Sequence, residues 1–148
     1  ELNNSSLVAR PLGRFRWVTC ASPDYLREYG VPPSPEALSQ HRAVHYFSGQ
    51  ARRADEFRFV RHGETFSVPV SGNAAVNETG LYIKMCLAGF GLAQLAENIV
   101  ADHLQEGRLV EVLTDWQPPP VPVTLLYPHQ RFLSPAVRAF AEWMSEVV

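Results

Sequence analysis

Four polar residues near the middle of the chain are the strongest candidates for binding chemistry. Ser71, Gly72 and Asn73 follow an extended apolar stretch, and Asn77 stands where a helix is expected to begin. Their side chains and backbone amides can hydrogen-bond a small polar ligand, and a helix N-terminus attracts a carboxylate. The structural alternative is that Asn77 caps its own helix while Gly72 and Asn73 turn the chain. Both roles can hold together, because a capped helix keeps other N–H groups free.

Motifs for other kinds of chemistry do not stand out in the sequence. The run Gly89-Phe90-Gly91 follows a predicted helix rather than a strand, so a helix stop is expected there instead of a dinucleotide site. The five histidines lack metal-ligand spacing, and the sequence has no Gly-x-Ser-x-Gly nucleophile elbow. Cys20 and Cys86 lie in apolar surroundings and are expected to be buried thiols. We therefore expect no enzyme activity, no cofactor and no metal.

The elements that would position the polar residues alternate between strands and helices, which favours an α/β fold. Near the N-terminus, two extended stretches are expected at 7–12 and 15–21, with Gly13 turning the chain between them. Serine-proline pairs can cap and open a helix. They predict helix starts at Ser22, Ser34 and Ser134.

The middle and the end of the chain are expected to follow the same alternation. A hairpin turn is predicted at 62–64, and a helix from Asn77 to about Ala88. The remaining predicted elements are strands at 43–47, 92–95, 109–113 and 123–128 and helices at 98–105 and 135–148. The Pro-rich stretch 116–122 predicts a stiff linker before the last strand.

Composition limits the classes of function. A chain of 148 residues with a formal charge of -2 is long enough for a sizeable core. It lacks the basic stripe of a nucleic-acid-binding domain, so DNA is not expected to be a direct partner of this piece. No apolar run approaches the ~20 residues of a membrane span, and no signal peptide is evident. A cytoplasmic location is expected. The chain does not begin with Met, which is compatible with a fragment or a processed form.

Short motifs occur in a fixed order along essentially the whole chain, and this order is more specific than any single motif. They lie at 6–13, 20–26, 38–41, 70–72, 76–77, 88–93, 107–110, 127–128 and 133–140. Typical examples are Ala88-Gly89-Phe90-Gly91-Leu92-Ala93 and Gly107-Arg108-Leu109-Val110. In this order they resemble the effector-binding domain in the C-terminal part of LysR-type transcriptional regulators.

The resemblance implies an α/β fold like that of type 2 periplasmic binding proteins, with two regulatory subdomains. The second subdomain would be complete, and of the first the C-terminal strand and helix would be present. Residues 1–21 would be the end of the first subdomain and a crossover strand. Residues 22–116 would be the second subdomain, and 117–148 the return linker, strand and helix of the first. The winged helix-turn-helix of the family would be absent from this chain.

The resemblance also implies a site and a function. A small-molecule effector, an organic acid being one candidate, would bind between the subdomains and alter a homodimer or homotetramer that contacts DNA through the absent N-terminal domain. By position in the motifs, the ligand-binding residues would be Asn4, Ser5, Val70, Ser71, Gly72, Asn73, Asn77, Gln94 and Leu95. The main alternative is a periplasmic solute-binding protein of the same architecture. An enzyme of another type and an isolated oligomerisation module also remain open.

Overall fold

The chain forms two compact units. The computed structural model describes residues 7–47, 56–128 and 134–147. Residues 16–119 make up one unit, called here the sheet unit. Residues 1–15 and 120–148 make up the other, called here the terminal unit. The stretch Trp17–Ala21, which the sequence analysis grouped with the N-terminal segment, therefore packs with the residues that follow it.

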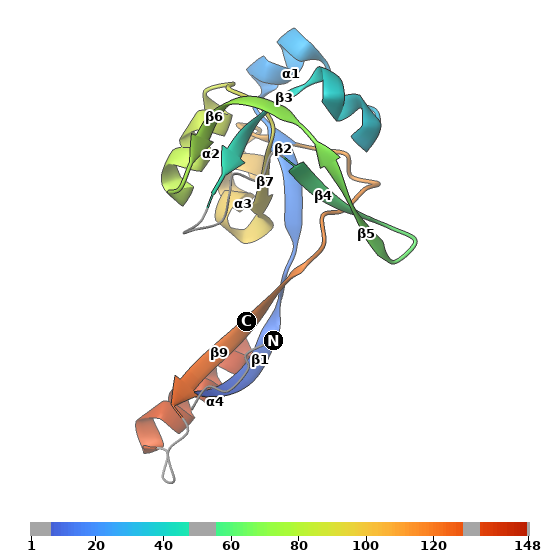
Figure 1. Cartoon of the computed structure of the whole chain (residues 1–148). Coiled ribbons are helices and arrows are strands. Elements are labelled where there is room, and N and C mark those ends of the chain that lie inside the picture. Colours follow the sequence, from blue (N-terminus) through green and yellow to red (C-terminus); the bar gives the residue numbers. More distant parts are fainter. Residues whose placement is uncertain (1–6, 48–55, 129–133, 148) are drawn as a thin grey trace. The chain divides into compact units, whose positions relative to one another are not determined.

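The sheet unit contains most of the helices and strands of the structure (Figure 1). Its strands are β2 (Trp17–Ala21), β3 (Arg42–Tyr46), β4 (Glu56–Arg61), β5 (Glu64–Pro69), β6 (Ser71–Val76), β7 (Ala93–Ala96) and β8 (Val110–Val112). Its helices are α1 (Pro23–Tyr29), the 3-10 helix η1 (Pro35–Gln40), α2 (Thr79–Leu87) and α3 (Glu97–Gln105).

The central strands of this unit run mostly in one direction. Strand β2 lies between β7 and β8 and is antiparallel to both. Strands β3 and β6 pair in parallel, and a parallel bridge between Ala43 and Leu92 connects them to β7. It follows that β3, β6, β7 and β8 share one direction, and β2 runs against them. Consecutive strands of one direction must be joined by crossover connections, and α2 and α3 supply helices for this purpose.

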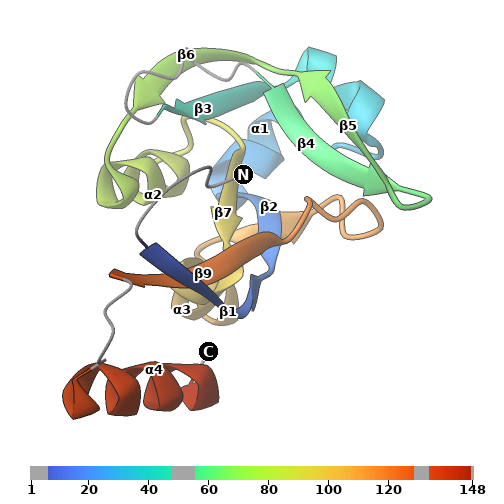
Figure 2. The same ribbon diagram turned by 60° about the horizontal axis from the view of Figure 1, so that its bottom comes forward.

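Alternating side chains of the central strands belong to two different apolar clusters. Val18 and Cys20 of β2 belong to the cluster that contains Tyr82 and Cys86 of α2 and Val100 of α3. Successive strand residues point to opposite faces. Accordingly, Ala21 of β2 and Ala43 of β3 belong to the other cluster, with Tyr25, Leu38, Phe57 and Phe59. This second cluster is covered by α1, η1 and the hairpin of β4 and β5 (Figure 2).

Local sequence signals explain several of the boundaries. The Ser22 hydroxyl accepts a hydrogen bond from the Tyr25 amide at 3.3 Å, and α1 begins with Pro23, as predicted. The hairpin turn is made by His62 and Gly63, both with positive φ (52° and 82°). Two such residues are what a type I′ turn requires. The predicted helix start at Ser134 is also confirmed, since its hydroxyl accepts from the Val137 amide at 3.3 Å.

Three local predictions are wrong. Gly13 does not turn the chain but lies inside a continuous strand, β1 (Leu7–Phe15), at a shift in the strand register. Residues 71–73, expected as a loop, begin strand β6, because they can pair in parallel with β3. Asn77 does not cap α2. The cap is Glu78, whose longer side chain reaches two backbone amides of the first turn.

The terminal unit is smaller and more open. Strand β1 pairs antiparallel with β9 (Val121–Pro128), and α4 (Pro135–Val147) contacts β1. Strand β9 begins earlier than predicted, inside the Pro-rich stretch. Among the described side chains of this unit, Ala141 is the one that is buried. The rings of Phe140 and Trp143 lie 6.0 Å apart between centroids and are inclined by 43°, yet both are about half exposed.

Candidate functional site

The central sheet splits where β3 and β7 end, and a hollow opens at the split. Beyond the bridge between Ala43 and Leu92, the Gln94 amide of β7 donates to the Tyr82 hydroxyl at 3.1 Å instead of to β3. Two adjoining cavities of about 190 and 240 Å³ lie there. They share Trp17, Tyr46, Tyr82 and Gln94 as lining residues. We call them together the strand-end hollow.

The direction of the strands explains why the hollow lies at this end of the sheet. The parallel strands β3, β6 and β7 all finish here, and α2 and α3 begin here after β6 and β7. In open α/β sheets, ligands bind in the crevice beyond the carboxyl ends of strands, near a change in strand order. The strand-end hollow has that position within the sheet unit.

Aromatic side chains form the walls of the hollow. The rings of Tyr46 and Tyr82 lie 5.5 Å apart and are inclined by 47°. The Tyr46 hydroxyl donates to the backbone carbonyl of Asn77 at 3.4 Å, which ties the end of β3 to the residues before α2. Tyr82 is 4% exposed, and burial raises the pKa of its hydroxyl, so it stays a neutral hydrogen-bonding group. Phe57 and Trp17 complete the aromatic lining.

Gln94 joins three strands at the floor of the hollow. Its Nε2 donates to the Thr19 hydroxyl at 3.2 Å and to the Arg58 carbonyl at 3.1 Å, and its Oε1 accepts from the Arg58 amide at 3.1 Å. The side-chain amide of Gln94 therefore hydrogen-bonds both backbone groups of Arg58 in β4, as the backbone of a neighbouring strand would. Because the donors and the acceptor of this side chain are used in these bonds, Gln94 shapes the hollow more than it hydrogen-bonds a ligand.

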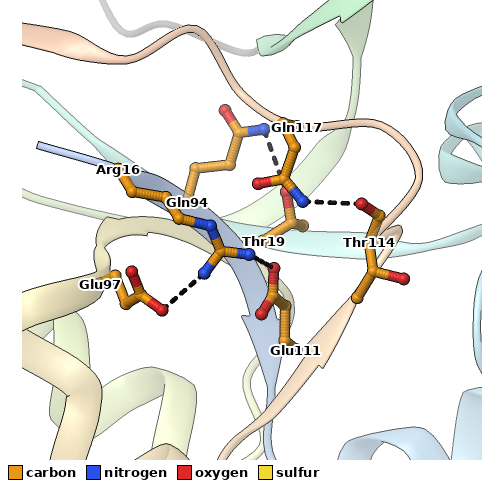
Figure 3. A network of polar contacts seen from close by, with 7 residues as sticks. All are labelled: Arg16, Thr19, Gln94, Glu97, Glu111, Thr114 and Gln117. Atoms are coloured by element: carbon orange, nitrogen blue, oxygen red, sulfur yellow. Dashed lines mark hydrogen bonds and ion pairs between the residues drawn. The ribbon is translucent and has the colours of Figure 1, made fainter.

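An ion-pair network surrounds the residue at which the sheet unit begins (Figure 3). The Arg16 guanidinium contacts Glu97 of α3 at 2.6 Å and Glu111 of β8 at 2.5 Å. Its carbonyl accepts from the Glu97 amide at 2.9 Å. Nearby, Gln117 donates to the Thr114 carbonyl at 2.6 Å. These bonds hold the entry and the exit of the sheet unit to its core strands.

The comparisons with known proteins identify the family. The model of the LysR substrate binding domain matches residues 1–148. The chain belongs to this family. The regulator YhjC, an HTH-type transcriptional regulator of Escherichia coli K12, is 34% identical to this LysR domain over 99% of the chain. An HTH-type transcriptional repressor of Pseudomonas aeruginosa is 36% identical over 99% of it. These matches cover 49% and 46% of the relatives, so the chain spans about half the length of the curated relatives it matches.

Solved structures support the same fold for the LysR domain. The Vibrio cholerae virulence activator AphB is 27% identical with a TM-score of 0.78, and the match covers 97% of this chain and 49% of AphB. The regulatory domain of CrgA from Neisseria meningitidis has a TM-score of 0.82 at 24% identity, over 99% of this chain and 71% of that domain. The predicted fold class and the predicted family are therefore confirmed.

The site residues predicted for this LysR domain fall in different places. Gln94 and Leu95 line the strand-end hollow, and Asn77 adjoins it through its carbonyl. Ser71 pairs with Arg42 at the opposite end of β6, where β3 begins, and Val70 is 1% exposed in the second apolar cluster.

Gly72 also lies near that opposite end and serves a close approach. A Cβ at Gly72 would lie 2.2 Å from the Ala43 carbonyl oxygen and 2.6 Å from the His45 ring. This contact explains the glycine by packing. Asn4 and Ser5 lie outside the described residues, as does the side chain of Asn73.

Sequence reasoning missed the aromatic residues of the LysR domain's hollow. It searched for polar groups, and Trp17, Tyr46 and Tyr82 read as core positions in alternating or helical patterns. A usable signal was present, because each stands close to a predicted strand end or helix start. Among the described residues, no group of three or more His, Cys, Asp and Glu side chains is placed to hold a metal ion. Within the same residues, no helix is long and apolar enough to cross a membrane.

Proposed function

We propose that this LysR domain senses a small-molecule effector for a bacterial DNA-binding transcriptional regulator. The observation that carries the proposal is the match of the whole chain to the LysR substrate binding domain, together with a hollow at the strand ends of the sheet unit. Its curated relatives are HTH-type regulators, which favours this function over the periplasmic solute-binding alternative.

The proposed effector site is the strand-end hollow, and the domain acts there without catalysis. Of the predicted site residues, Gln94 and Leu95 line this hollow, and we add Trp17, Tyr46 and Tyr82 to the proposed site. Effector binding favours one arrangement of the regulator over another, and a tenfold shift needs only about 1.4 kcal/mol of differential affinity. DNA contact belongs to a helix-turn-helix region outside this chain, and the regulator acts as a homo-oligomer in the cytoplasm.

The open apolar surface of the terminal unit fits the same proposal. Phe140, Trp143 and Leu126 are 50%, 54% and 43% exposed. Of these, Phe140 and Trp143 are in ring contact, and exposed apolar surface of this kind often marks a contact with another part of the protein or a partner. We propose that the remainder of the regulator, which accounts for the other half of the relatives' length, covers it.

A space-filling substitution tests the site in the full-length regulator. Ile99 lines the hollow and is 42% exposed, so Ile99→Trp should fill the space without disturbing the core. The expected result is that target-gene transcription no longer responds to the growth condition that changes it in the parent strain. Val31→Trp adds the same bulk at a position that is 62% exposed and does not line the hollow, and it should keep the response. A normal response in the Ile99→Trp strain would contradict the proposed site.

A further inference from the structure

Among the described residues that line it, the strand-end hollow has aromatic faces, an acidic group and the imidazole of His45, but no lysine or arginine. Trp17, Tyr46, Phe57 and Tyr82 supply rings from three strands and a helix. The acidic group among these described residues is the carboxylate of Glu56, which is exposed at the start of β4. Cations bind favourably over aromatic faces, most strongly over Trp and Tyr. A carboxylate would find no lysine or arginine among the described residues of this wall, and aromatic faces carry partial negative charge.

The N-terminus of α2, at this end of the sheet, is already occupied by one of the chain's own carboxylates. Both carboxylate oxygens of Glu78 accept from the first turn of α2, at 2.7 Å from the Gly80 amide and 2.6 Å from the Leu81 amide. These two bonds hold the pKa of Glu78 below its ordinary value, so the group stays ionised. Glu78 thus takes the place that a ligand carboxylate would otherwise use.

No side chain caps the start of α3, but its first amide and the nearby arginine have partners within the chain. The Glu97 amide donates to the Arg16 carbonyl, and the Arg16 guanidinium binds two carboxylates. The positive charge nearest to the first turn of α3 is therefore already neutralised. A ligand carboxylate at the start of α3 would lie close to the Glu97 carboxylate of the first turn, and like charges repel.

We propose that the effector of the strand-end hollow is a small aromatic amine, bound as a cation over the Trp17, Tyr46 and Tyr82 rings, and that aromatic carboxylates are rejected. This inference rests on the proposed function of the same site. An apolar cavity of about 150 Å³ holds benzene. Each part of the hollow is larger than that, at about 190 and 240 Å³, so a single aromatic ring system fits. The organic acid suggested by the sequence depended on a free N-terminus of α2, which Glu78 fills.

Three probes with one ring system test the charge preference by isothermal titration calorimetry on the 148-residue chain. Tryptamine carries a positive charge at neutral pH, indole carries none, and indole-3-acetate is negative. Tryptamine should bind at least about tenfold more tightly than indole-3-acetate. Equal or tighter binding of indole-3-acetate would overturn the inference and leave the effector site in place. Failure of all three probes to bind would remove the hollow as an effector site, and the inference with it.

Exchange of Glu78 tests the reason for the preference. Glu78→Ala frees the Gly80 and Leu81 amides, so indole-3-acetate should gain several-fold in affinity and the ratio between the two charged probes should fall. Ser22→Ala is the matched control, because it removes the cap of α1 without touching the hollow, and it should leave the ratio unchanged. Thermal melts show that both variants are folded before titration. An unchanged ratio in Glu78→Ala would show that this carboxylate does not exclude anions.

Discussion

The sheet unit and the terminal unit both contain large apolar side chains, but the two units differ in how far these side chains are buried. In the sheet unit, Phe59 and Leu92 are fully buried in the second of two clusters that lie on opposite faces of the central strands. In the terminal unit, Phe140 and Trp143 are half exposed, and two paired strands with one helix enclose little space. Isolated strand pairs are marginal until further strands or helices cover them. The comparison teaches that the sheet unit supplies its own stability, while the terminal unit depends on contacts beyond itself.

The largest expected contrast comes from removing one phenylalanine ring in each unit. Phe59→Ala should cost about 3–5 kcal/mol of unfolding free energy, because a buried ring leaves a cavity. Phe140→Ala should cost less than about 1 kcal/mol, because the ring is already half in water. Urea unfolding followed by circular dichroism measures both. Equal losses would show that the two units do not differ as the burial suggests.

A methyl group at Gly72 tests how tightly the strands of the sheet unit approach. Its Cβ would lie 2.2 Å from the Ala43 carbonyl oxygen, so β3 and β6 must move apart. Overpacking of this kind costs about 1–3 kcal/mol, which the urea midpoint of Gly72→Ala will show. Ser71→Ala, on the same strand but exposed, should change the midpoint by less than about 0.5 kcal/mol. A Gly72→Ala protein as stable as the parent would contradict the close approach.

Gln94→Leu tests whether one side chain joins the strands around the hollow. The change leaves the Thr19 hydroxyl and both backbone groups of Arg58 without their partner, at a cost of about 1–3 kcal/mol. Hydrogen exchange should become faster at the Arg58 amide, whereas the amides of the terminal unit should be unaffected. Unchanged exchange at Arg58 would mean that the amide is protected by something other than Gln94.

Acid should weaken the sheet unit through His41. Burial lowers the pKa of His41, whose Nδ1 lies 3.1 Å from the Tyr25 hydroxyl. Because the native pKa is below the unfolded value of about 6.5, the stabilisation is present above that pH and is lost as pH falls through the native pKa. Urea midpoints at decreasing pH should fall less steeply for His41→Gln than for the parent. Parallel slopes would exclude His41 as the source.

The smallest expected effect is at Arg16, where the sheet unit begins. Its ion pairs join side chains that are between 22% and 44% exposed, so Arg16→Ala should cost no more than about 1 kcal/mol. High salt should reduce the difference from the parent, because salt screens exposed charges. A loss that is large and independent of salt would mean that Arg16 supports the fold by packing instead.

Local signals predicted those parts of the fold that depend on neighbouring residues. The serine caps of α1 and α4 and the hairpin turn at His62 and Gly63 involve contacts within a few residues, and sequence showed them correctly. The cap of α2 was displaced by one residue, because both Asn77 and Glu78 can reach free amides. Strand β6 was missed altogether, since its partner β3 lies about thirty residues earlier and pairing between distant strands leaves no local pattern.

For the candidate site, too, some features were predicted from the sequence and others depended on the tertiary structure. The sequence by itself determined the α/β alternation, the family and the approximate stretch in which a ligand would be sought. Only the tertiary structure decided which side chains meet. It placed Ser71 beside Arg42 at the start of β3, away from the hollow that Gln94 lines, and brought Trp17 to Tyr46 and Tyr82. The physical reason is that caps and turns are local bonds, whereas a hollow forms where strands far apart in the sequence diverge. At that end of the sheet, Glu78 fills the helix end that the sequence offered to a ligand.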